Sequence, residues 1–205
     1  MRGASTLVLN GQLFQSDLAQ RLQCRVHVQN DANCLAVSEA VDGAGQGSGV
    51  VFAAILGTGC GGGIAFQGKA WAGRHAIAGE WGHNPLPWPT LDELQVPACW
   101  CGQVGCLETW ISGTGFSRDH ALMYGGDLAA FQIIEQMRRG DTSATQSFER
   151  YQNRLGRALA QVVNLLDPDC IVLGGGMSNV DEIYTNIQSE ILRYTFSKTV
   201  RTPVR

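Results

Sequence analysis

The sequence predicts an α/β fold, because apolar runs of strand length alternate with longer segments of helical periodicity. Val50–Leu56 and Asp169–Leu173 are nearly continuous apolar runs, as expected of buried strands. Ser143–Leu166 has helical spacing over a length that strands rarely reach, and Asp167-Pro168 ends it. These three segments set the expected order of strand, helix and strand.

The remaining elements follow from the same periodicity. A helix is expected over 13–23, a short alternating strand over 25–29, and a helix after Asn30–Asn33 that runs to about Val41. A glycine run at 57–63 interrupts the strand pattern, which resumes at 64–66. Residues 73–105 contain four prolines and are expected to be a functional or disordered loop. Further helices are expected to begin at 106–111 and to cover 128–138 and 180–196.

Composition limits the class of protein. The chain has 205 residues, 44% of them hydrophobic, and a net charge of −3. Basic residues are scattered, which gives no electrostatic signature for nucleic acid or an anionic membrane. No apolar run approaches the roughly 20 residues of a membrane span, and the first ten residues do not resemble a signal peptide. The expected compartment is the cytoplasm.

One segment carries the residues of a metal site. His83 is followed by Cys99, Cys101 and Cys106, which together supply one imidazole and three thiols. This is the ligand set of a closed tetrahedral zinc site. The alternative is a loop with three free thiols, which would oxidise readily when exposed. The sequence therefore favours structural zinc held by these four side chains.

Two glycine-rich turns follow predicted strands. The segment Gly57–Gly62 fits the pattern G-x-G-x-x-G, but a second strand rather than a helix follows it, which argues against a Rossmann site. A strand–turn–strand can still direct backbone N–H groups at phosphate oxygens. A glycine-rich turn without a ligand is the alternative in both places. The candidate residues are Gly57, Thr58, Gly59 and Gly61 in the first turn and Gly174, Gly175 and Gly176 in the second.

Three carboxylates are candidates for substrate chemistry. Asp31 lies between a predicted strand and a predicted helix, where its ordinary role is a helix N-cap. A carboxylate there can also accept a proton from a substrate hydroxyl within reach. Glu80 precedes His83 by three residues and Glu108 follows Cys106 by two, so both are expected near the metal. The alternative for both is a solvated carboxylate without a role.

Together these segments resemble the ROK family (repressors, open reading frames, kinases). The matching segments occur in the family's order. Within the family, Gly79–Trp88 is similar to the bacterial fructokinase, or manno(fructo)kinase, subgroup. The segments are Asn30–Asn33, Gly57–Gly63, Gly79–His83, Cys99–Glu108 and Asp167-Pro168 through Gly176.

The resemblance implies an actin-like ATPase (ribonuclease-H-like) kinase fold whose two lobes close on ATP and a hexose. It implies transfer of phosphate from ATP, with Mg²⁺, to a primary hydroxyl of fructose or mannose, with N-acetylglucosamine as the alternative. Asp31 is expected to be the catalytic base, and the glycine turns are expected to face the nucleotide. The residues expected to bind the sugar are Asn30, Asp31, Glu80, His83 and Glu108.

The sequence also departs from the family pattern. Family kinases begin with a strand that carries Asp-x-Gly-x-Thr, and no such motif precedes Asn30. We therefore expect 1–42 to be a remnant of the N-terminal lobe with Asp31, and 43–205 to be mostly the C-terminal lobe, without a closing element at 202–205. Because phosphoryl transfer relies on positioning, this chain is expected to be weak or inactive as a kinase.

Two further functions are alternatives to a kinase. A sugar-sensing transcription regulator belongs to the same family, but the DNA-binding domain of such regulators is not found in this sequence. A non-catalytic sugar-binding remnant is the other. The expected partners are a hexose and ATP, without nucleic acid or membrane, and a homodimer is the assembly to test.

Overall fold

The computed structural model describes residues 7–95 and 97–205, and the chain divides into two units, Met1–Asp31 and Ala32–Arg205. In the first unit, a 3-10 turn at Leu7–Leu9 (η1) precedes helix α1 (Phe14–Leu22), which confirms the helix predicted there. The strand predicted over 25–29 is wrong, because these residues have no strand partner in the described part of the chain. The backbone N–H of Val28 instead donates to the side chain of Gln15.

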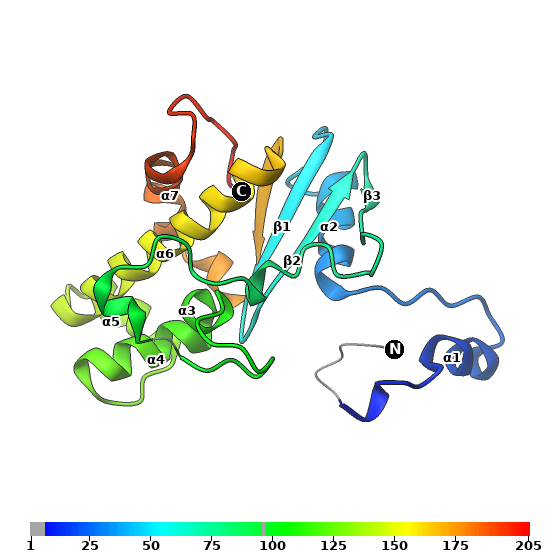
Figure 1. The fold of residues 1–205 in the computed structure, drawn as a ribbon, viewed down its shortest axis with the longest axis horizontal. Coiled ribbons are helices and arrows are strands. Elements are labelled where there is room, and N and C mark those ends of the chain that lie inside the picture. Colours follow the sequence, from blue (N-terminus) through cyan, green and yellow to red (C-terminus); the bar gives the residue numbers. More distant parts are fainter. Residues whose placement is uncertain (1–6, 96) are drawn as a thin grey trace. The chain divides into compact units, whose positions relative to one another are not determined.

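The second unit contains a four-stranded mixed sheet in the order β3-β2-β1-β4 (Figure 1). The central strand β1 (Val50–Leu56) pairs antiparallel with β2 (Cys60–Phe66) and parallel with β4 (Cys170–Gly174). A short β3 (Lys69–Ala70) lies outside β2. β2 begins at Cys60, earlier than predicted, so Gly61–Gly63 belong to a strand rather than to a turn.

The last residues extend the sheet beyond β4. The N–H of Ile171 donates to the carbonyl of Pro203 at 2.9 Å, and the N–H of Leu173 donates to that of Arg205 at 2.8 Å. The pairing is a single isolated bridge between Ile171 and Val204, so the expectation that 202–205 carry no closing element stays a prediction. A proline is tolerated at this edge because it contributes only its carbonyl to the pairing.

Helices cover both faces of the sheet, and the alternation of side chains along β1 decides which core each residue joins. Phe52 and Leu56 belong to the larger core, on the side of α6 and α7, whereas Val51 and Ala53 pack with Ala36 of α2 in a smaller core (Figure 1). The helices are α2 (Asp31–Val41), α3 (Glu108–Ile111), α4 (Gly113–Tyr124), α5 (Ala130–Arg138), α6 (Thr142–Leu166) and α7 (Asp181–Tyr194).

The helices predicted near 130, 150 and 185 are confirmed as α5, α6 and α7, but the sequence did not separate α4 from α3. Ser112 caps α4 by accepting a hydrogen bond from the N–H of Gly115 at 2.9 Å. Gly115 is required where α4 meets α3, because a Cβ there would lie 2.7 Å from the carbonyl oxygen of Thr109. Two glycines in its first turn hid this helix from a reading of periodicity.

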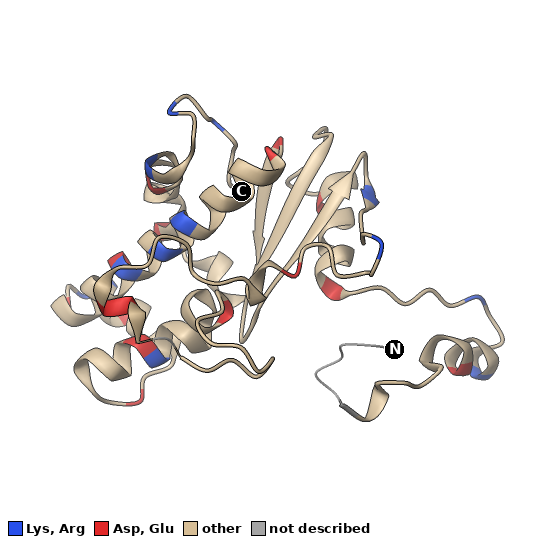
Figure 2. Cartoon of the chain, viewed as in Figure 1, with Lys and Arg blue, Asp and Glu red and all other residues tan. Residues whose placement is uncertain are grey.

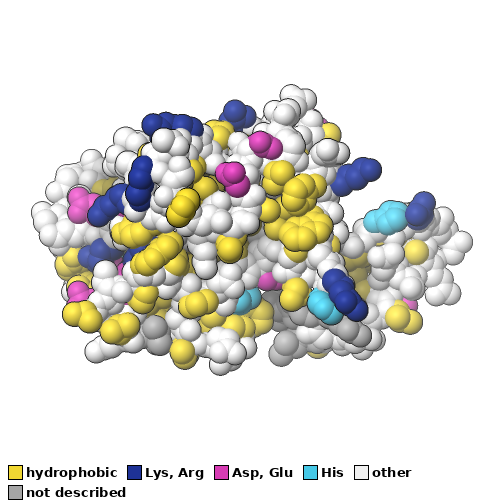
Figure 3. Space-filling model, turned by 45° about the horizontal axis from the view of Figure 1, so that its top comes forward, with side chains coloured by type: hydrophobic (Ala, Val, Ile, Leu, Met, Phe, Trp, Pro, Cys, Tyr) yellow, Lys and Arg dark blue, Asp and Glu magenta, His cyan; other side chains and the backbone are white. Residues whose placement is uncertain are grey.

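Charged residues are excluded from the sheet interior. Strands β1, β2 and β4 contain none, whereas α5, α6 and α7 carry many (Figure 2). On the face seen in Figure 3, basic and acidic side chains are interspersed with exposed apolar ones. Among the described residues, every helix is too short or too polar to cross a membrane.

Candidate active site and metal centre

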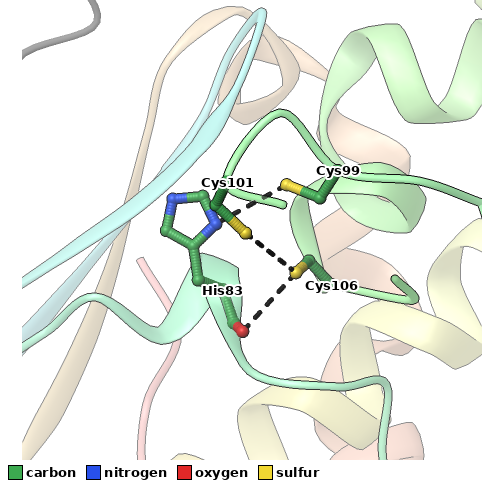
Figure 4. Close-up of side chains that lie close together, drawn as sticks. All are labelled: His83, Cys99, Cys101 and Cys106. Atoms are coloured by element: carbon green, nitrogen blue, oxygen red, sulfur yellow. Dashed lines mark hydrogen bonds between the residues drawn. The ribbon is translucent and has the colours of Figure 1, made fainter. Parts of the chain in front are cut away.

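The four predicted metal ligands lie together (Figure 4). One donor atom from each of His83, Cys99, Cys101 and Cys106 lies within 4.8 Å of the others. The Sγ of Cys99 lies 3.7 Å from Nδ1 of His83, and the two sulfurs of Cys101 and Cys106 are also 3.7 Å apart. A tetrahedral zinc ion with Zn–S bonds of about 2.3 Å separates its sulfurs by about 3.8 Å. The spacing of the donor atoms therefore fits zinc.

A tight turn brings the three sulfurs together. An isolated β-bridge joins Ala98 to Val104, and the N–H of Cys99 donates to the carbonyl of Gln103 at 2.8 Å. Gly102 adopts a φ of 90°, a left-handed conformation in which a side chain would be strained. Backbone hydrogen bonds and Gly102 therefore form the turn that carries the cysteines. We call residues 99–106 the metal turn.

Two of the three thiols resist ionisation, whereas a hydrogen bond from the backbone of Gln103 lowers the pKa of the third, Cys101. Cys99 and Cys106 are buried, and burial with the neighbouring thiols raises the pKa of Cys106 to about 12. Burial also raises the pKa of Cys99. A divalent metal supplies the missing positive charge and displaces the thiol protons. The chemistry of the donor set therefore agrees with its geometry.

Glu108 lies beside the metal turn, as its spacing predicts. Its Oε1 accepts a hydrogen bond from the indole nitrogen of Trp100 at 2.6 Å, and its Oε2 accepts one from the N–H of Cys60 at 3.0 Å. A Cβ on Gly59 would lie 2.6 Å from the same Oε2, so a side chain there would displace the carboxylate from this position. Glu108 therefore joins the metal turn to the β1–β2 hairpin.

Glu80 lies at the entrance to the 3-10 turn η2 (Trp81–His83), and its side chain is exposed. The residue after it, Trp81, donates from its indole to the carbonyl of Gly61 at 2.7 Å. A Cβ on Gly62 would lie 2.7 Å from the carbonyl oxygen of Gly79. The glycines of β2 therefore permit close packing of the segment that carries Glu80 and His83.

A cavity of about 660 Å³ brings the two glycine turns together. Gly57 and Thr58 of the hairpin line it, as does Gly176 at the start of the 3-10 turn η4 (Gly176–Asn179). Of the other predicted nucleotide residues, Gly59, Gly61, Gly174 and Gly175 are not part of this lining. The volume is within the range of about 300–1,000 Å³ found for small-molecule sites.

The start of α4 and the helix α5 complete the cavity, and the sequence did not predict their involvement. Thr114 and Ser117 of α4 and Glu135 and Arg138 of α5 are part of the lining. The N–H of the first α4 residue donates to the carbonyl of Gly57 at 2.7 Å, which ties this helix to the hairpin. The capping motif that begins at Ser112 is the signal from which this contribution could have been found.

The sequence also missed a buried ion cluster on the loop between His83 and the metal turn. Oε1 of Glu93 lies 2.7 Å from Nε of Arg154 and 2.6 Å from Nη2 of Arg157. Burial raises the pKa of Glu93, but hydrogen bonds from the two arginines outweigh burial and lower the pKa to about 2. Arg157 also donates to the carbonyl of Trp88 at 2.8 Å. The cluster holds the loop against α6.

Asp31 is the first residue of α2 and Asn30 precedes it. Asp31 therefore lies inside the first turn of α2 rather than at the N-cap position considered from the sequence, and a carboxylate in this turn interacts favourably with the helix dipole. Both residues belong to the first unit, whereas Glu80, His83 and Glu108 belong to the second. Their convergence on one sugar stays a prediction.

Comparison with known proteins identifies the family. The model described as "ROK family" matches residues 5–205, so this chain belongs to the ROK family. An N-acetyl-D-glucosamine kinase of Pectobacterium carotovorum is 44% identical over 190 residues, which cover 89% of this chain and 62% of the relative. The chain thus spans about three fifths of the length of such curated relatives.

Solved structures confirm the fold. A ROK family glucokinase from Streptomyces griseus, in complex with glucose and AMPPNP, matches with a TM-score of 0.81 at 30% identity. The match covers 95% of this chain and 67% of the glucokinase chain. A ROK hexokinase from Thermus thermophilus matches with a TM-score of 0.82 at 29% identity, over 93% of this chain and 64% of the hexokinase chain. The predicted actin-like ATPase kinase fold is therefore confirmed. The predicted fructokinase subgroup gains no support, because the curated relative is named for N-acetylglucosamine.

Proposed function

We propose that this protein is an ATP-dependent hexose kinase and that N-acetylglucosamine is the first substrate to test. The observation that carries the proposal is a cavity that residues of both glycine turns line together. Glu108 joins the hairpin that carries the first of these turns to the four-ligand cluster. The choice of sugar is supported by the name of the Pectobacterium relative. Fructose or mannose is the second candidate, supported by the similarity of Gly79–Trp88 to the fructokinase subgroup.

The nucleotide is assigned to the cavity. Thr58 and Gly176 offer backbone N–H groups and one hydroxyl along its wall, and such groups bind phosphate oxygens well. The N–H of Gly57 instead donates to the carbonyl of Gly59 at 3.0 Å and so shapes the turn. Bound Mg²⁺ would offset the charge of the phosphates while the protein positions them. The relative from Streptomyces griseus was solved with AMPPNP, which supports an adenine nucleotide as the ligand.

The sugar is assigned to the side of the hairpin that carries the metal turn. Zinc, held by His83, Cys99, Cys101 and Cys106, would order a segment with little regular structure. Because Nδ1 of His83 faces the sulfur of Cys99, its Nε2 is left to contact a sugar hydroxyl. Asn30, Glu80 and Glu108 are assigned to other hydroxyls.

Asp31 is assigned the role of catalytic base. Its carboxylate would accept the proton of the sugar hydroxyl as that oxygen attacks the γ-phosphate of ATP. A helix begins at Asp31, and its second residue, Ala32, packs closely against Gly63 of β2. A base must be placed within hydrogen-bond reach of the hydroxyl, and the start of α2 is the position assigned to it.

A sugar panel tests the proposal. ADP release should be measured with N-acetylglucosamine, fructose, mannose and glucose, for the wild type, for Asp31→Asn and for Asp42→Asn as a control carboxylate just after α2. We expect the Asp31 variant to lose about 10²–10⁴ in kcat and the control to lose nothing. Equal turnover by the wild type and Asp31→Asn on every active sugar would refute the role of Asp31. Because this chain is expected to turn over weakly, sugar and AMPPNP binding are also measured by calorimetry, and the absence of both ADP release and binding would refute the kinase.

A further inference from the structure

Trp100 lies between two metal ligands and has no assigned role. Its side chain is 65% exposed, which is unusual for a large aromatic that makes two directed contacts. Its ring meets the imidazole of His83 edge to face, with centroids 5.1 Å apart and planes at 83°. Its indole N–H donates to Oε1 of Glu108 at 2.6 Å. Both contacts are directed at residues of the candidate site rather than at the hydrophobic core.

Glu108 is held at both ends. While Trp100 bonds one oxygen, the N–H of Cys60 bonds the other at 3.0 Å. Cys60 is the first residue of β2 and pairs with Leu56 to close the hairpin whose turn lines the cavity. One carboxylate therefore spans from the metal turn to the residues assigned to the nucleotide.

We propose that Trp100 is a positioning residue whose indole N–H fixes Glu108 between the metal turn and the β1–β2 hairpin. An ionised carboxylate has about four acceptor positions, so a sugar hydroxyl can still bind while both protein donors are in place. Trp100 acts through Glu108 on the sugar and, through Cys60, on the nucleotide turn. The expected effect of Trp100 on substrate binding rests on the proposed function, whereas its effect on the position of Glu108 does not.

The decisive variant is Trp100→Phe, which keeps an aromatic ring against His83 and removes only the N–H donor. In the zinc-loaded protein without substrates, hydrogen exchange of the Cys60 amide should become about threefold to tenfold faster, as expected for loss of one charge-assisted hydrogen bond at an exposed site. Zinc affinity, measured by competition with a chelator, should fall by less than the roughly 100-fold expected when a ligand is removed, because the four ligands and the aromatic ring against His83 are retained. Trp88→Phe is the matched control, since Trp88 is half exposed and stacks on Tyr194.

Calorimetry then measures the consequence for substrates. Affinities for AMPPNP and for the active sugar should each fall about threefold to tenfold in Trp100→Phe and stay unchanged in Trp88→Phe. In a Glu108→Ala background, Trp100→Phe should add almost nothing, because the residue through which it acts is gone. If Trp100 acted independently of Glu108, the losses of affinity from the two substitutions would add.

The outcomes separate the two proposals. Unchanged exchange of the Cys60 amide in Trp100→Phe, or full additivity with Glu108→Ala, would overturn the positioning role even if the kinase is active. If the wild type binds no nucleotide and no sugar, the proposed function fails, while the exchange of the Cys60 amide still decides whether Trp100 positions Glu108.

Discussion

Two clusters of side chains hold the same irregular segment, and they do so in opposite ways. The metal cluster gathers one imidazole and three thiols, which repel one another when ionised. The carboxylate–guanidinium cluster places Glu93 against Arg154 and Arg157, whose charges compensate it within the chain. The first cluster is therefore complete only with an added cation, and the second needs none.

The difference shows how a loop with little regular structure is ordered. Glu93 serves two purposes, because its Oε2 also accepts a hydrogen bond from the N–H of Thr90 and so caps the 3-10 turn η3 (Leu91–Leu94). Arg154 stacks on Trp110 at 4.5 Å and pairs with Asp119 at 2.8 Å. One end of the segment is thus fixed to α6 by the chain's own charges, and the other end is expected to depend on metal.

The largest expected effect is the loss of metal on removal of a ligand. Cys106→Ala should lower zinc affinity by more than about 100-fold, because changes outside the ligand shell alone cost about 10- to 100-fold. Zinc content by elemental analysis and chelator competition measures this, with Cys34→Ala on the exposed side of α2 as the control. A variant that retains stoichiometric zinc with wild-type affinity would show that Cys106 is not a ligand.

The next effect is a loss of stability on breaking the second cluster. Glu93→Ala leaves two buried guanidinium groups without their partner and should lower the free energy of unfolding by about 3–5 kcal/mol. Arg193→Ala, which removes an exposed pair with Glu190, should change it by less than about 0.5 kcal/mol. Urea denaturation of the zinc-loaded proteins compares them. Similar losses of unfolding free energy in both variants would mean that the buried Glu93 cluster stabilises the fold no more than the Arg193–Glu190 pair does.

Acidification should separate the clusters. The pKa of Glu93 is lowered to about 2 from 4.5, so its stabilisation is fully present above about pH 4.5 and is lost as pH falls towards 2. The shift corresponds to about 3 kcal/mol. Thiolates take up protons at higher pH than this carboxylate, so zinc release to a coloured chelator should precede the unfolding seen by circular dichroism. Release and unfolding at one pH would show that the clusters are not independent.

The sequence by itself predicted the clustering of the four candidate metal ligands and the strands β1 and β4. The donor residues are recognisable from their own chemistry and lie in one segment, so their meeting needs only a local turn. The glycine turns were found in the same way, because glycine marks backbone that must approach something closely. The strand predicted over 25–29 failed because alternation describes a face but supplies no partner strand.

Tertiary structure alone decided the rest, because it depends on contacts between distant residues. Glu93 and Arg154 are 61 residues apart, and neither has a local pattern that indicates the other. The cavity needs the start of α4 and one side of α5 beside the hairpin, and Gly62 and Gly63 serve packing because of what lies across from β2. Local chemistry can be recognised from residue type and spacing, whereas charge compensation and cavity walls exist only once the chain has folded.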